Sequence, residues 1–154
     1  MTSPVTIRTA IPGDIPEMVA LLGELFAIEA DFRPDPALQH QGLALMLRDP
    51  VSRRILVAVE DGKVIGMCSL QILVSTAQGG QVGLVEDVVV AAPWRGRGIG
   101  AMLMRALEES AAEIGLSRLQ LLADADNVPA LNFYRLRGWN STKLICLRKE
   151  GDPS

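Results

Sequence analysis

Apolar positions recur along this chain with two periods, and these periods predict its helices and strands. Residues spaced three and four apart from Ile15 to Phe26, and again from Ile99 to Ile114, are apolar, as in amphipathic helices. Short apolar runs at 5–9, 54–60, 63–72, 82–90, 118–123 and 142–148 are typical of strands. Two less regular helices are expected over 37–47 and from Pro129. The resulting order, β-α-α-β-β-β-α-β-α-β, indicates an α/β fold with a sheet of mixed pairing.

Residues that favour turns and caps mark the ends of these elements. Asp14 is placed to cap the first helix, and Asp61-Gly62 predicts a two-residue hairpin between two strands. Gly115 marks the end of the helix that begins at Ile99. No repeat or long linker interrupts the 154 residues, so a single domain over 1–154 is expected.

The segment Arg95-Gly96-Arg97-Gly98-Ile99-Gly100 lies between a predicted strand and a predicted helix. Alternate glycines allow a tight turn and let a ligand approach the backbone amides without a Cβ in the way. At a helix N-terminus those amides and the helix dipole favour an anion, and two arginines add positive charge. We therefore expect this loop to bind phosphate.

Two other phosphate-binding patterns fit the loop less well. The Walker pattern fails because no Gly-Lys-Ser/Thr follows the glycines. The dinucleotide fingerprint fits Gly96, Gly98 and Ala101, with Asp124 about 20 residues further on. However, five residues separate the strand from this loop, and only about 50 residues follow it, which is short for a second βαβαβ half.

Three motifs in order resemble those of the GNAT superfamily, the acetyl-CoA-dependent N-acetyltransferases. Arg95, Gly98 and Gly100 match its Gln/Arg-x-x-Gly-x-Gly/Ala signature. Further on, Asn127-x-x-Ala130-x-x-Phe133-Tyr134 is followed by Gly138-Trp139, where Gly-Phe is usual. At the start, Ile7-Arg8 leads to Gly13-Asp14 and an amphipathic helix. The resemblance runs from Val5 to Trp139 and implies a mixed, mostly antiparallel central sheet flanked by helices.

The resemblance also implies a co-substrate and the residues that bind it. Acetyl-CoA is expected as the donor of the acetyl group, with no metal. Its phosphates would lie on the glycine loop, and its pantetheine arm would enter beside a splayed strand. The residues expected to bind it are Val88, Val90, Arg95, Gly96, Arg97, Gly98, Ile99, Gly100, Ala101, Asn127 and Tyr134.

Acetyl transfer to an amine requires a base for the ammonium proton and a stabilising group for the departing thiolate. Glu86 and Asp87 are the candidate bases, and the resemblance favours Glu86, with Asp87 orienting substrate or serving the structure. Neighbouring strand residues face opposite ways, so only one would point into the cleft unless a bulge intervenes. Tyr134 is the candidate acid, since phenol and thiol pKa values lie close together. A buried, ion-paired acid or a packed tyrosine remains the structural alternative.

Composition and charge argue against several classes of function. No apolar run approaches the ~20 residues that span a bilayer, and no signal peptide is apparent. A net charge of −3 without a basic stripe argues against nucleic-acid binding. His40 has no cluster of metal ligands around it. Cys68 and Cys146 lie in apolar segments and are expected to be small buried residues of a cytoplasmic protein.

The C-terminus departs from the family pattern. Only 15 residues follow Trp139, which leaves room for one strand where the family has two. The strand over 142–148 would then have a bare edge, and a second copy could cover it, so a homodimer is expected. The expected function is acetyl transfer from acetyl-CoA to a small-molecule or peptide amine by direct attack in a ternary complex. The alternative is a non-catalytic acetyl-CoA sensor or interaction module.

Overall fold

The computed structural model describes residues 3–29 and 33–152. They form two compact units, Met1–Leu121 and Leu122–Ser154. The single domain expected over 1–154 stays a prediction.

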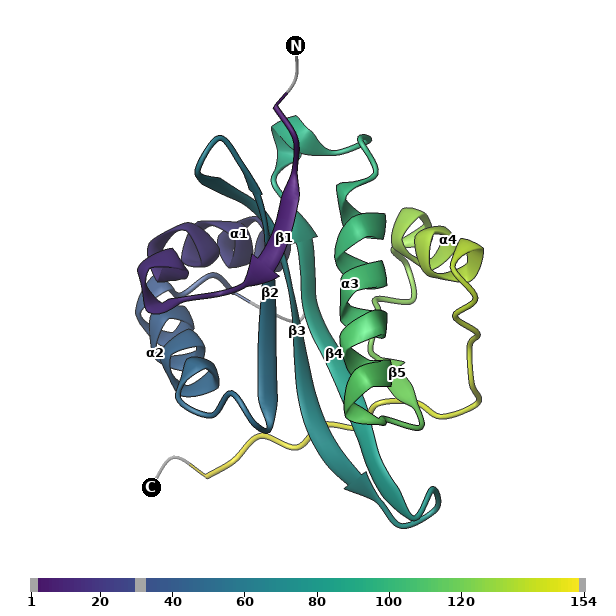
Figure 1. The fold of residues 1–154 in the computed structure, drawn as a ribbon. Coiled ribbons are helices and arrows are strands. Elements are labelled where there is room, and N and C mark those ends of the chain that lie inside the picture. The colour runs from purple at the N-terminus through teal and green to yellow at the C-terminus, as the bar shows by residue number, and fades with distance from the viewer. Residues whose placement is uncertain (1–2, 30–32, 153–154) are drawn as a thin grey trace. The chain divides into compact units, whose positions relative to one another are not determined.

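The first unit is built on a five-stranded sheet in the order β1-β2-β3-β4-β5 (Figure 1). Its strands are β1 (Thr6–Thr9), β2 (Arg53–Glu60), β3 (Lys63–Ser75), β4 (Gly80–Val90) and β5 (Leu119–Leu121). The first three pairings are antiparallel, and β4 pairs with β5 in parallel. The expected mixed, mostly antiparallel sheet is therefore confirmed. So is the hairpin at Asp61-Gly62, where both residues have positive φ (49° and 73°).

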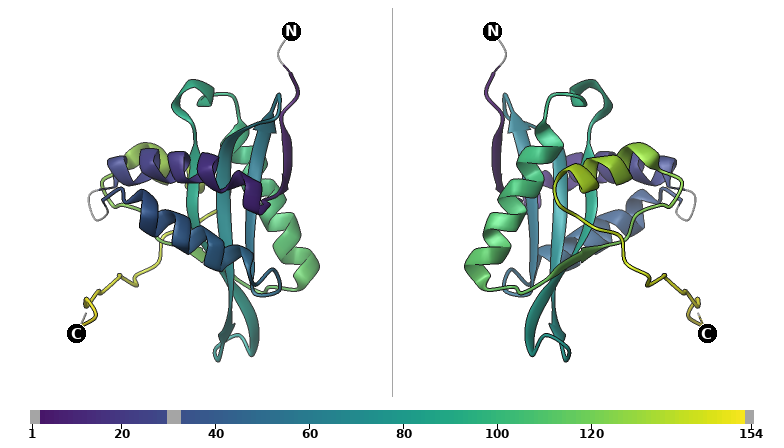
Figure 2. Two further views of the ribbon diagram at one scale, coloured as in Figure 1. Left: turned by 90° about the vertical axis from the view of Figure 1, so that its left-hand side faces the viewer. Right: turned by 90° about the vertical axis from the view of Figure 1, so that its right-hand side faces the viewer.

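Helices cover both faces of this sheet. The helices α1 (Ile15–Ile28) and α2 (Pro36–Leu47) lie on one face, and α3 (Ile99–Ile114) lies on the other (Figure 2). Beneath α1 and α2, a buried apolar cluster joins Met18, Leu22 and Leu43 to Ile55, Val57, Met67 and Val89 of the sheet. The opposite face packs buried residues of α3, among them Leu103, against buried Cys68 and Leu70. Burial of two apolar faces is the main stabilising term for such a layered fold.

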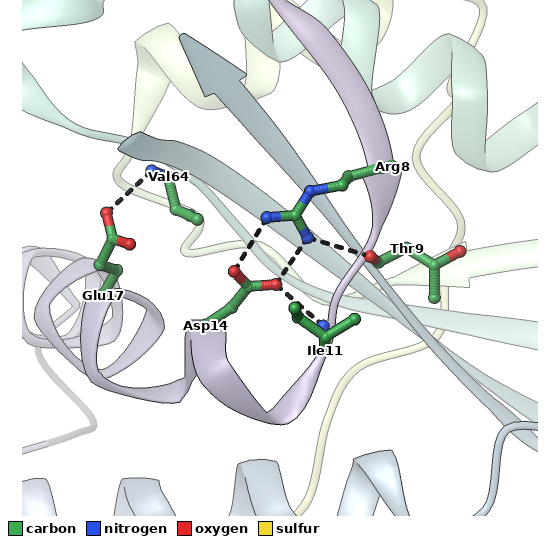
Figure 3. Close-up of polar contacts among 6 residues, drawn as sticks. All are labelled: Arg8, Thr9, Ile11, Asp14, Glu17 and Val64. Carbon is green, nitrogen blue, oxygen red and sulfur yellow. Dashed lines mark hydrogen bonds and ion pairs between the residues drawn. The ribbon is translucent and has the colours of Figure 1, made fainter. Parts of the chain in front are cut away.

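The start of α1 is anchored to the sheet by two polar contacts (Figure 3). Arg8 of β1 donates two hydrogen bonds to the carboxylate of buried Asp14, at 2.7 and 3.0 Å. Asp14 also accepts from the Ile11 amide, and the hydrogen bonds from Arg8, followed by this one, lower the pKa of Asp14. Glu17 accepts from the Val64 amide of β3 at 2.8 Å. Asp14 was expected to cap α1; it occupies the N-cap position, but its side chain makes no cap bond because it pairs with Arg8 instead.

The second unit contains the helix α4 (Val128–Leu136). Asn127 caps it by accepting a hydrogen bond from the Ala130 amide at 3.2 Å, as the sequence predicts. Gly138 follows the helix with φ 87°, a conformation that favours glycine.

The strand expected over 142–148 does not form, and this expectation was wrong. None of the described residues after Leu136 is in a strand. Its side chains are exposed, with fractions of 78% for Leu144, 80% for Ile145 and 86% for Leu147. Cys146 is therefore exposed, which corrects the expectation that both cysteines are buried. Cys68 is buried, and burial raises the pKa of its thiol to about 12.

Candidate functional site

A β-bulge in β4 decides how the two adjacent carboxylates point. Met67 of β3 pairs with Val89, but Ser69 pairs with Glu86, so β4 holds one residue more than β3 between these pairs. Asp87 takes up the extra residue with a left-handed backbone (φ 55°). The usual alternation, which would send neighbouring side chains to opposite faces, is interrupted at this point.

Because of the bulge, Glu86 and Asp87 line the same pocket. This pocket has a volume of about 540 Å³, is bounded by α1, α2 and the strands β2, β3 and β4, and has both carboxylates in its wall. Its apolar lining includes Leu22, Phe26 and Met46. Its volume falls within the range of small-molecule sites. The pocket is formed entirely by residues of the first unit.

The environments of the two carboxylates differ. Asp87 is half-buried, whereas Glu86 is exposed. Burial, and then the negative charge of Glu86, raise the pKa of Asp87 to about 6. The Ser69 hydroxyl lies 3.4 Å from Asp87 Oδ2 and 3.0 Å from the Glu86 carbonyl, and its hydrogen bond to Asp87 opposes part of that rise. A carboxyl with a pKa near neutrality is suited to exchanging protons with a ligand.

Beyond the bulge, β4 has one edge that β5 does not cover. β5 pairs only with Gly83, Leu84 and Val85, so residues 86–90 lie past the parallel ladder. The Ala91 amide bonds to Ile65 of β3 at 2.8 Å. By the alternation of an antiparallel ladder, the backbone groups of Val88 and Val90 point to the uncovered edge. An extended ligand with amide groups can pair with such an edge.

The glycine loop follows a short 3₁₀ helix (Ala92–Trp94) and leads directly into α3. Gly96 and Gly98 both have φ 79°, and a Cβ at either would meet no atom within 4 Å. The space in front of the loop is therefore open. The first hydrogen bond of α3 runs from the Met102 amide to the Gly98 carbonyl, so the amides of Ile99, Gly100 and Ala101 precede the helical ladder. These amides at a helix N-terminus form a site suited to an anion.

The two arginines of the loop have different surroundings. Arg95 donates from Nε to the Val90 carbonyl at 2.8 Å, and its Nη2 lies 3.6 Å from Glu24 of α1. Glu24 in turn accepts from the Ala92 amide at 3.0 Å. Arg95 thus fixes the loop between β4 and α1. Arg97 is exposed.

The remaining expected site residues, Asn127 and Tyr134, belong to the second unit. Within that unit the Tyr134 ring packs edge-on against Phe133, with centroids 5.2 Å apart, and lies 6.0 Å from the Trp139 ring. Arg137 stacks on the Phe133 ring at 3.8 Å and donates to the Phe133 carbonyl. The first unit alone therefore brings together Glu86, Asp87, Val88, Val90 and the loop from Arg95 to Ala101.

The sequence did not point to the polar residues of the pocket other than Glu86 and Asp87, among them Ser69, Gln39 and Arg53. Ser69 interrupts an apolar run on β3, and Gln39 lies one turn before Leu43 on the buried side of α2. A polar side chain at an apolar position was the available indication in both cases. Arg53 gave none, because arginine at the start of a strand is common on protein surfaces.

Other kinds of site find no support in the described residues. Within 3–29 and 33–152, no three His, Cys, Asp or Glu side chains are grouped so that they could hold a metal ion. In the same ranges, every helix is too short or too polar to cross a bilayer.

The chain is similar in sequence to known acetyltransferases. The model of the acetyltransferase (GNAT) family matches residues 17–139. The aminoalkylphosphonate N-acetyltransferase of Salmonella typhimurium is 30% identical over 137 residues, which cover 88% of this chain and 85% of that protein. The streptothricin acetyltransferase of Streptomyces lavendulae is 35% identical over 106 residues, covering 69% of this chain and 54% of that protein.

A solved structure supports the fold. The crystal structure of glucosamine-6-phosphate N-acetyltransferase from Arabidopsis thaliana superposes with a TM-score of 0.75. The alignment covers 97% of this chain and 99% of that chain at 24% identity.

Proposed function

Because this chain belongs to the acetyltransferase (GNAT) family and is an N-acetyltransferase of that type, we propose that it transfers an acetyl group from acetyl-CoA to a primary amine. The amine would attack the thioester directly, with donor and acceptor bound together. The observation that carries this proposal is the bulge that turns Glu86 and Asp87 into one pocket, next to the uncovered edge of β4.

The donor would bind along β4 and the loop. The amides of Ile99, Gly100 and Ala101 would hold the pyrophosphate, with the charge of Arg97 close by in sequence. The pantetheine arm would pair with the backbone of Val88 and with the Val90 amide, which point away from β3, while the Val90 carbonyl accepts from Arg95. Arg95 would act indirectly by fixing the loop, and Gly96 and Gly98 by keeping its face open.

The acceptor amine would enter the pocket as an ammonium ion. An aliphatic ammonium has a pKa of about 10.4, so it must lose a proton before it attacks. Sequence analysis favoured Glu86 as the base. We instead propose Asp87, because burial brings its pKa to about 6, and we assign Glu86 to holding the ammonium.

Two variants separate these roles by their pH–rate profiles. If Asp87 is the base, the pH–rate profile has an acidic limb: kcat/KM falls as the pH drops below about 6, where Asp87 is protonated. Removing the charge of Glu86 in Glu86→Gln lowers the pKa of Asp87, so this limb should move to lower pH. Asp87→Asn should abolish the limb together with most of the activity. A limb that persists in Asp87→Asn and vanishes in Glu86→Gln would return the role of base to Glu86.

Tyr134 would stabilise the thiolate of departing CoA, and Asn127 would bind the pantetheine. Support comes from the match of both residues to the family motif and from the aromatic contacts that hold the Tyr134 ring. A phenol has a pKa near 10 and a thiol about 8.5. The phenol can therefore donate a strong hydrogen bond to the thiolate sulfur, or transfer its proton to it, at a small cost in free energy.

A homodimer completes the proposal. Three apolar side chains close together in the sequence are exposed, and none of these residues is in a strand: Leu144, Ile145 and Leu147. A second copy would bury these side chains and supply hydrogen bonds to their backbone.

An acceptor panel tests the proposed reaction. Acetyl-CoA is mixed with amines, amino acids, polyamines, aminoglycosides or peptides, and released CoA thiol is measured. We expect release that depends on at least one primary amine. Binding of acetyl-CoA without acceptor-dependent release from any class would instead support the sensor.

A further inference from the structure

The pocket contains a buried amide group that the protein leaves unpaired. Gln39 of α2 is 8% exposed and lines the pocket. Neither its Nε2 nor its Oε1 has a hydrogen-bond partner among the described residues. An unpaired buried polar group destabilises a fold, and a bound ligand can supply the missing hydrogen-bond partners. A ligand at this place needs an acceptor oxygen for Nε2 and a donor hydrogen for Oε1.

A positively charged side chain, that of Arg53, lines the same pocket. Arg53, the first residue of β2, lines the pocket and donates from Nη1 to the Leu45 carbonyl at 3.1 Å. That bond uses one of the five donors of the guanidinium. It holds the group at the C-terminal part of α2, six residues, or about 9 Å along the helix, from Gln39.

The sheet register gives the spacing between this cation and the two acids. Ile55, Ser69 and Glu86 form one row across β2, β3 and β4, and Arg53 and Gln71 form the next row on the same face. Rows on one face are two residues, or about 7 Å, apart, and β2 and β4 are about 10 Å apart. A short bifunctional molecule matches this separation, with its amine at the acids and its other end at Arg53.

We propose that the acceptor amine carries an oxyanion, a carboxylate or a phosphate-type group, which Arg53 binds while Glu86 and Asp87 receive the amine and the Gln39 amide pairs with a polar atom of the same acceptor. This inference rests on the proposed function, since it concerns the acceptor side of the same site. The guanidinium supplies charge and the Gln39 amide supplies direction.

The other charged residues of the pocket do not alter this assignment. Arg33 and Asp35 also line it, but both are exposed, so solvent and salt screen their charges. Asp35 is also engaged, as it accepts from the Leu38 amide to cap α2. Arg53 therefore sets the positive end of the pocket.

Four small primary amines test the inference. They are n-propylamine, ethanolamine, β-alanine and O-phosphoethanolamine, which end in a methyl, hydroxyl, carboxylate and phosphate group. We expect kcat/KM for acetyl transfer to be at least about tenfold higher for one of the oxyanion-bearing amines than for n-propylamine. The comparison of β-alanine with O-phosphoethanolamine identifies which oxyanion is bound. Similar kcat/KM values for all four amines would overturn the inference and leave the proposed function standing.

Two variants with matched controls locate the binding groups. Arg53→Gln should bring the ratio of oxyanion-bearing amine to n-propylamine close to one. Arg54→Gln, at the next residue of β2 and on the opposite face, should keep the native ratio. Gln39→Leu should raise KM for the preferred oxyanion amine and also raise the midpoint of thermal unfolding, because it removes an unpaired buried amide. Gln41→Leu, at an exposed position of α2, should do neither. A lower unfolding midpoint with unchanged KM in Gln39→Leu would assign Gln39 to the structure alone and overturn its role.

Calorimetry measures binding of the oxyanion-bearing amine independently of acetyl transfer. With CoA present, saturable binding of O-phosphoethanolamine or β-alanine, but not of n-propylamine, supports the oxyanion site even if no amine is acetylated. In that event the proposed function fails and the binding site stands. Absence of selective binding together with absence of transfer would overturn both.

Discussion

Asp87 has a left-handed backbone at the point where β4 gains one residue over β3. The sequence Glu86-Asp87 in an apolar run predicts that both acids lie on this strand, and they do. It does not predict their common direction, because strand alternation alone separates neighbouring side chains. The bulge depends on the pairing of β4 with β3, which is a tertiary property. The sequence therefore identified the acids but not their shared pocket.

The raised pKa of Asp87 predicts a stability that depends on pH. Above about pH 6 the folded chain holds a charge that burial and Glu86 disfavour, whereas below about pH 4 the carboxyl is neutral in both folded and unfolded states. Asp87→Asn removes this cost and tolerates the left-handed backbone. We expect it to raise the free energy of unfolding by up to roughly 3 kcal/mol at pH 8, with a gain that disappears towards pH 4.

Urea unfolding of both proteins at pH 8 and pH 4 measures this difference. Asp124→Asn, at an exposed acid outside the pocket, serves as the control and should change stability little at either pH. An equal effect of Asp87→Asn at both pH values would contradict a raised pKa.

The proposed role of Tyr134 predicts that its replacement changes turnover but not acetyl-CoA binding. Tyr134→Phe keeps the ring that packs against Phe133 and Trp139 but removes the hydroxyl. Acetyl-CoA affinity, measured by calorimetry, should be unchanged, while kcat falls by roughly 10²–10⁴, the usual effect of losing a positioned acid. A kcat within twofold of the native value would remove Tyr134 from the chemistry.

At the scale of elements, the helix α3 is the part that the sequence predicted best. Its expected bounds, Ile99 to Ile114, are those of the structure, because a strong helical period lies between Gly98 and Gly115. Both glycines have positive φ, which explains why the helix begins and ends there. The strand expected over 142–148 does not form, although its apolar pattern was the basis of that prediction. Its apolar composition favours a strand, but a strand forms only with a hydrogen-bonded neighbour.

The glycine loop at the start of α3 predicts a steric effect on donor binding. Gly98→Val places a branched side chain in the open space before the helix N-terminus, so acetyl-CoA affinity measured by calorimetry should fall by at least about tenfold. Gly115→Val introduces similar backbone strain at the other end of the same helix, where φ is 88° and the space is also open. It should destabilise the chain comparably and leave the affinity unchanged. Equal loss of affinity in both variants would attribute the effect to strain, and native affinity in folded Gly98→Val would contradict the phosphate site.

At the scale of the whole molecule, the exposed apolar segment Leu144–Leu147 predicts self-association. Light scattering at micromolar concentration should give the mass of a dimer. Replacing Ile145 by Lys should shift the mass towards the monomer, because a charge on a buried interface is strongly disfavoured. Replacing exposed Leu136 by Lys is the matched control and should leave the mass unchanged. A monomer mass for the native chain would refute the dimer.

The central claim is direct transfer of acetyl from acetyl-CoA to an amine bound in the pocket of Glu86 and Asp87. Initial velocities over a grid of acetyl-CoA and amine concentrations test it most directly, with CoA and N-acetylated product both quantified. The account predicts one CoA per N-acetylated product and intersecting double-reciprocal lines, as for a ternary complex. Parallel lines would indicate an acetylated enzyme intermediate and contradict direct attack, and CoA release that does not depend on the amine would contradict acetyl transfer.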